Sequence, residues 1–80
     1  MDKETAAYLL LIAEQRVKEA TQRTARQREV VAGLQRNFGH QYDEAHELLE
    51  QLMLFERILL QECDRLRTIR DRPAKQSGDD

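Results

Sequence analysis

The chain has little of what stabilises very small domains or builds β-sheets. It contains one cysteine, one proline, three glycines, two Phe, two Tyr and no Trp. One cysteine cannot form a disulfide within the chain, no Cys/His set has zinc-site spacing, and strand-forming residue types are scarce. A lone cysteine is typical of a reducing cytosol rather than a secreted domain. We interpret Cys63 as a small buried hydrophobe on a helix face rather than a reactive thiol.

A strong charge of either sign and a long apolar run are missing as well. The net charge is -2, which creates no field that would attract nucleic acid or an anionic membrane. The apolar run 6–13 is far shorter than the roughly 20 residues of a membrane span. Asp2 and Glu4 are unsuited to the positive start of a signal peptide. We therefore expect a cytoplasmic protein without a membrane segment.

Helix-forming residues dominate what remains, with charged residues at 35%. The pattern predicts an all-α fold, an antiparallel two-helix hairpin over residues 1–72. The first helix should cover about 4–37, the turn 38–41 and the second helix about 42–71. Gly39 can adopt the left-handed conformation that ends a helix. The polar tail 73–80, which begins at Pro73, is expected to be disordered.

Apolar residues on both predicted helices recur at alternating three- and four-residue spacings, the pattern of helices packed at a shallow angle. When the chain is folded at Gly39, small residues of the first helix lie opposite large ones of the second. Residues 16–36 carry six cations and 43–64 carry seven acids, so the hairpin also pairs opposite charges. The predicted hairpin core is Ala13, Val17, Ala20, Val31, Leu34, Leu48, Leu52, Phe55, Leu59 and Leu66.

Two polar residues, Thr24 and Gln27, occupy positions in the first helix that should face the second. Buried polar residues in coiled coils can fix register or partner choice. Alternatively, long polar side chains extend to the edge of the contact, which is then merely looser there. The sequence leaves both interpretations open.

Apolar side chains outnumber what one neighbouring helix can cover. Those of the second helix span an arc of roughly 260°, where one neighbour needs about 100°. A second copy, giving a homodimeric antiparallel four-helix bundle, is the simplest cover, and a different protein partner is the alternative. The residues predicted to form this oligomer or partner interface are Tyr8, Leu11, Ile12, Leu49, Met53, Leu54, Ile58 and Leu60.

Residues with catalytic or ligand-binding chemistry give only weak signals. The acidic segment 43–50 contains His46 at the spacing Asp43-x-x-His46, which is related to the Glu-x-x-His of di-iron bundles. His46 and Glu50 point away from the apolar side, however, and the first helix offers no inward carboxylate. No nucleophile with a positioned base and no Gly-rich phosphate loop is present. We therefore expect no enzyme activity, no metal and no cofactor.

A basic run near the end of the second helix raises the possibility of nucleic-acid contact. Its residues are Arg65, Arg67, Arg70, Arg72 and Lys75. Neither stacking aromatics nor helix-turn-helix spacing accompanies them, so we interpret them as cations that complement the negative end of a helix.

Three segments resemble one group of proteins: Ile12-Ala13-Glu14-Gln15-Arg16-Val17, Ala25-Arg26-Gln27-Arg28-Glu29-Val30-Val31, and Gly39-His40 with Ala45 and Leu48-Leu49. Together they are similar to small uncharacterised bacterial proteins with an Ala-Arg-Gln-Arg-Glu run and a Gly-His turn. The chain departs from that group at Gln41-Tyr42, where Asp-Thr is more usual. The resemblance implies a helical hairpin and no activity.

The sequence thus favours a non-enzymatic protein-interaction module. A small inhibitor or adaptor that docks on a larger protein is the alternative, followed by a nucleic-acid-associated protein that uses the basic run.

Overall fold

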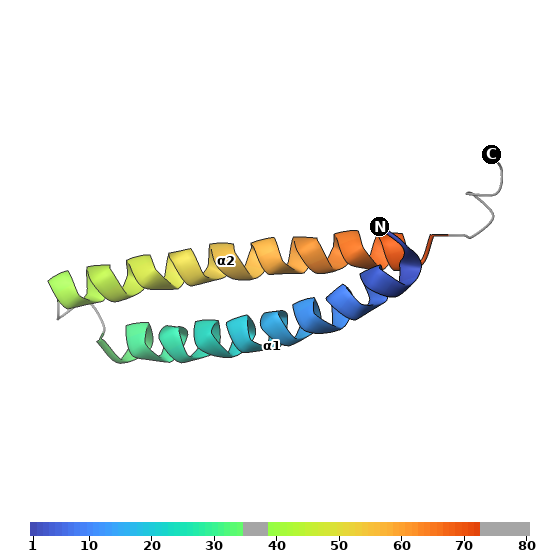
Figure 1. Cartoon of the computed structure of the whole chain (residues 1–80). Helices are drawn as coiled ribbons and strands as arrows, with labels where there is room; N and C mark the ends of the chain where they lie inside the picture. The colour runs from blue at the N-terminus through green and yellow to red at the C-terminus, as the bar shows by residue number, and fades with distance from the viewer. Residues whose placement is uncertain (35–38, 73–80) are drawn as a thin grey trace.

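The described residues form two long helices that pack as an antiparallel hairpin. The computed structural model describes residues 1–34 and 39–72. Helix α1 spans Lys3–Leu34 and helix α2 spans His40–Arg70. The two helices run side by side, and the start of α1 lies next to the end of α2 (Figure 1). At 1.5 Å per residue each helix is about 48 Å long. The predicted two-helix hairpin is confirmed.

Helix α1 begins at Lys3, one residue before the start expected from the sequence. Asp2 Oδ1 accepts a hydrogen bond of 2.7 Å from the Thr5 backbone N–H, which caps the start of α1. This bond lowers the pKa of the Asp2 carboxyl. The expected extension of the first helix to residue 37 lies outside the described residues beyond Leu34, as does the predicted tail 73–80.

Helix α2 begins two residues earlier than predicted. Gly39 precedes it with φ 47°, a left-handed conformation that glycine adopts without a Cβ clash. The other end is closed by Asp71, whose backbone N–H donates to the Arg67 carbonyl at 2.9 Å. This stop agrees with the position of Pro73, which cannot continue a helix.

In the part of the chain that the structure describes, the hairpin core forms two apolar clusters, one near each end. Near the termini the cluster contains Leu10, Ala13, Cys63 and Leu66, with Leu9 and Val17 packed against it. Near the turn it contains Val31, Ala45 and Leu49, with Leu34 and Tyr42 alongside. Most buried residues are small, since they include four alanines, Thr24 and Cys63. Small side chains let the helices approach closely, but each buries little apolar area.

Several polar groups contribute to the contact between the two clusters and beside the one near the turn. The Thr21 hydroxyl donates to the Glu56 carboxylate at 2.7 Å, and the Gln27 side-chain amide donates to the Ala45 carbonyl at 2.8 Å. Thr24 is fully buried. Gln27 therefore forms a specific hydrogen bond across the hairpin. This bond favours the interpretation that Gln27 fixes the register of the two helices.

The face that α1 turns toward α2 is the predicted one. Its members are buried or half-buried at four- and three-residue spacings: Ala6, Leu10, Ala13, Val17, Ala20, Thr24, Gln27, Val31 and Leu34.

The face that α2 turns toward α1 differs from the prediction. Leu48 and Phe55, assigned to the hairpin core, are each 46% exposed, whereas Leu49, assigned to the outer interface, is only 9% exposed. We call the residues that face α1 the inner seam of α2; they are Tyr42, Ala45, Leu49, Leu52, Glu56, Leu59, Cys63 and Leu66.

The difference between the predicted and the observed face of α2 has a geometric cause. Three positions of the inner seam, Leu49, Glu56 and Cys63, lie seven residues apart and therefore share one side of the helix. Apolarity alone favours Phe55, the residue before Glu56. The Thr21–Glu56 hydrogen bond shows why a carboxylate is tolerated there.

Candidate interaction surface

Helix α2 carries large apolar side chains that the hairpin does not cover. They are Leu48, Met53, Leu54, Phe55, Ile58 and Leu60, with 42–56% of each residue exposed. All six fall within 13 consecutive residues. Single exposed leucines are ordinary on protein surfaces, but a contiguous group of this size is typical of an interaction site.

Part of this group forms a second regular line along α2. We call it the outer seam; its positions are Glu44, Leu48, Gln51, Phe55, Ile58, Glu62 and Arg65, again at four- and three-residue spacings. On a helical wheel it lies about 100° from the inner seam, and Leu54 flanks it. The middle of the line is mainly apolar, one end is acidic and the other ends in an arginine. It therefore has the pattern of a helix that packs against a second neighbour.

Two further apolar side chains lie on the other flank of α2. Met53 and Leu60 are exposed there. Along this flank Arg67 reaches across to Glu14 of α1, with 3.2 Å between Nη2 and Oε2. The mixture of an interhelical ion pair with isolated apolar groups is less suited to a dry contact than the outer seam is.

Helix α1 offers exposed large apolar residues only near its two ends. Tyr8, Leu11 and Ile12 are exposed at the start and Val30 near the end. Within residues 13–29, all of which the structure describes, no large apolar side chain is exposed. The middle of α1 is therefore a polar surface.

Seven of the eight residues predicted for the outer interface are exposed in the hairpin. They are Tyr8, Leu11, Ile12, Met53, Leu54, Ile58 and Leu60. Leu49 is not available because it belongs to the inner seam. Leu48 and Phe55 were missed, and both lie in the outer seam. Leu48 and Phe55 are seven residues apart, as are Leu49 and Glu56, so each pair lies on one side of the helix. With Leu49 and Glu56 in the inner seam, Leu48 and Phe55 belong to the outer seam.

The arginines considered for nucleic-acid contact pair with the chain's own carboxylates. Arg65 binds Glu62 at 2.7 Å, Arg67 binds Asp64 at 3.1 Å, and Arg70 binds Asp71 at 2.8 Å. These hydrogen bonds lower the pKa of the Glu62 and Asp71 carboxyls. Arg72 is exposed, and Lys75 lies outside the described residues. A phosphate would have to compete with an existing partner at three of the four arginines of this run.

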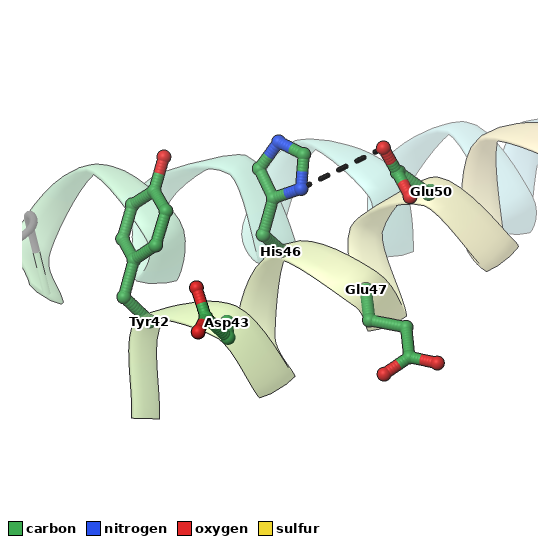
Figure 2. A pocket seen from close by; sticks show the side chains of 5 residues that line it. All are labelled: Tyr42, Asp43, His46, Glu47 and Glu50. Carbon is green, nitrogen blue, oxygen red and sulfur yellow. Dashed lines mark ion pairs between the residues drawn. The ribbon is translucent and has the colours of Figure 1, made fainter. Parts of the chain in front are cut away.

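The histidine-containing segment forms an open depression at the start of α2. Figure 2 shows its lining, in which every side chain comes from one helix: Tyr42, Asp43, His46, Glu47 and Glu50. His46 Nδ1 lies 3.7 Å from Glu50 Oε2, and its ring stacks on Tyr42 with 5.8 Å between centroids. Within 1–34 and 39–72, no three His, Cys, Asp or Glu side chains converge as a metal site would require. The geometry is that of paired neighbours on one helix surface.

Cys63 lies in the cluster near the termini and is 1% exposed. Burial raises the pKa of its thiol. A buried thiol with a raised pKa is a poor nucleophile, in agreement with its interpretation as a packing residue.

Neither described helix contains a stretch both long and apolar enough to cross a bilayer. Compared with protein-family models, with curated proteins and with solved structures, the chain matches none of them.

Proposed function

We propose that this chain is a non-enzymatic protein-interaction module that works as a homodimer, an antiparallel four-helix bundle built from two hairpins. One observation carries the proposal: the six large apolar side chains of α2 that remain about half exposed in the single hairpin.

The free energy at stake is large for so small a chain. Full burial of a Leu, Ile, Phe or Met side chain stabilises by about 1.5–3 kcal/mol. Six such side chains left about half exposed forfeit about 5–9 kcal/mol, which is comparable to the whole stability of a small domain. A surface that covers them therefore changes the stability of the chain decisively.

The hairpin core is too poor to make up for this loss. Among the buried residues of 1–34 and 39–72, only Leu10 and Leu66 are both large and less than 2% exposed, beside the small Thr24 and Cys63. Two-helix units of this size have little core of their own and commonly gain stability by association.

A second copy supplies the missing cover with the same surface. A two-fold axis requires only one self-complementary patch, and hairpins that pair in this way form a four-helix bundle. The chain would then act by presenting the outside of the bundle, or the groove between its hairpins, to a protein partner.

Sedimentation equilibrium over a range of micromolar concentrations tests the proposal. The expected mass is twice the 9.4 kDa of the chain. The double variant Leu54→Glu/Ile58→Glu should shift the equilibrium toward the monomer, because it places charge on exposed apolar positions. The control Gln22→Glu/Ala25→Glu adds the same charge at exposed positions of α1 and should leave the mass unchanged.

A folded wild-type monomer at these concentrations would contradict the homodimer. If a larger protein then bound the monomer one to one, the adaptor or inhibitor role would replace it.

A further inference from the structure

The outer seam identifies how two copies meet. We infer, on the basis of the proposed homodimer, that α2 packs against α2 of the second copy in antiparallel orientation along the outer seam, with the two-fold axis between Leu54 and Phe55.

The position of the axis follows from the apolar part of the seam. A two-fold contact requires that if residue i of one copy meets residue j of the other, then j also meets i. The exposed apolar residues of α2 extend from Leu48 to Leu60, so their centre lies at Leu54. With the axis beside it, Leu54 meets Phe55 of the copy and Gln51 meets Ile58, so the apolar middle of each seam covers the other.

The polar middle of α1 indicates that α2 forms the contact between the two copies. Because its residues 13–29 expose no large apolar side chain, the middle of α1 has nothing to contribute to a dry contact. Helix α2 exposes six such residues over the same stretch of the hairpin. The contact therefore centres on α2, and the polar side of α1 stays outside.

The orientation follows from charge. Residues 40–50 contain four carboxylates and no Arg or Lys, whereas residues 57–70 contain four arginines and two carboxylates. A parallel contact would place carboxylates against carboxylates, which is repulsive. The antiparallel contact places Glu44 opposite Arg65 of the copy. Arg65 already binds Glu62, and a guanidinium has five N–H donors, enough for a second carboxylate.

Single cysteines introduced into a Cys63→Ala background test the geometry by disulfide cross-linking. Phe55→Cys lies beside the axis, so it should form a disulfide-linked dimer on its own. Leu60→Cys is the matched control, since Phe55 and Leu60 are both 46% exposed on the same helix but lie on opposite flanks. Cross-linking of Phe55→Cys should be faster by on the order of tenfold or more, because a disulfide requires Cα atoms within about 7 Å.

A second pair of cysteines tests orientation. Glu44→Cys and Arg65→Cys should each fail to cross-link alone, because each residue lies about 32 Å along the helix from its own copy. The two variants refolded together should give the mixed disulfide, which mass spectrometry distinguishes from either homodimer. Cross-linking of Glu44→Cys with itself would show a parallel contact and overturn the inference.

The failures of the inference and of the proposed function are distinguishable. If the Cys63→Ala chain sediments as a dimer but cross-links through Leu60→Cys instead of Phe55→Cys, the homodimer stands and the inferred contact is wrong. If the chain sediments as a folded monomer, the proposed homodimer itself is wrong, and the inference falls with it.

Discussion

Two adjacent leucines of α2 should respond differently to the same substitution. Leu49 is 9% exposed and packs in the core cluster near the turn, whereas Leu48 is 46% exposed and lies in the outer seam. Replacing either by alanine removes three carbon atoms, so chemistry and helix propensity change equally. Any difference in stability therefore reports where each side chain packs.

The magnitudes follow from burial. Three buried carbons are worth about 2.4 kcal/mol at roughly 0.8 kcal/mol each. Leu49→Ala should therefore lower the free energy of unfolding by about 2.5–4 kcal/mol once the cavity is included. Within the hairpin Leu48 is little more than half covered, so Leu48→Ala should cost only about 1 kcal/mol there. In the dimer, where the rest of Leu48 is covered, its cost should rise to about 2 kcal/mol per chain.

Urea denaturation followed by circular dichroism provides the assay, with each variant measured in dilute and in concentrated protein. The cost of Leu49→Ala should be similar in both, and that of Leu48→Ala should rise with concentration. If the two variants lose equal free energy of unfolding in dilute protein, the assignment of Leu49 to the inner seam is wrong. If the free energy lost in Leu48→Ala does not depend on protein concentration, Leu48 does not belong to the association surface.

The remaining predictions concern four single residues. Thr24→Val should stabilise the chain by about 1–2 kcal/mol in urea denaturation, since the fully buried Thr24 Oγ1 has no hydrogen-bond partner among the described residues; a loss of stability would show that the hydroxyl is bonded. Gly33→Ala should stabilise by about 0.5–1 kcal/mol, because a Cβ there meets nothing within 4 Å. Gly39→Ala should destabilise by about 1–2 kcal/mol, because Gly39 has the left-handed φ of 47°. Thermal melts in which both glycine variants shift the melting temperature in the same direction would contradict these two predictions. Iodoacetamide should modify Cys63 on the order of 100-fold more slowly in the native chain than in urea, since the attacking species is the thiolate. Because burial raises the pKa of that thiol above its ordinary 9.0, stability should fall as pH rises past that value, a decline that Cys63→Ala should lack.

The sequence was sufficient for the hairpin and for the contact face of α1. In the middle of α1 a small residue such as Ala20 lies between the polar residues Glu19 and Thr21, so the spacing has one solution there. Gly39 and Pro73 bound the second helix clearly, because each restricts the backbone directly.

The contact face of α2 could not be assigned by hydrophobicity alone. Its apolar residues surround most of the helix, so two regular seams are possible, and one of them contains Glu56. A ranking by apolarity selects Phe55, whereas in the structure Glu56 occupies this position and accepts a hydrogen bond from the Thr21 hydroxyl of α1. A buried Cys63 indicates the observed contact face. Counting back seven residues at a time from a buried Cys63 gives Glu56 and Leu49, the observed inner seam.

Hydroxyl-radical footprinting at increasing protein concentration tests most directly whether another surface covers the apolar side of α2. Phe55 is the reporter, and Met1, which is 61% exposed at the chain start, serves as the internal reference. Covering by a second copy predicts that oxidation of Phe55 falls relative to Met1 as the chain associates. Undiminished oxidation of Phe55 at every concentration, in a chain whose circular dichroism shows intact helices, would contradict it.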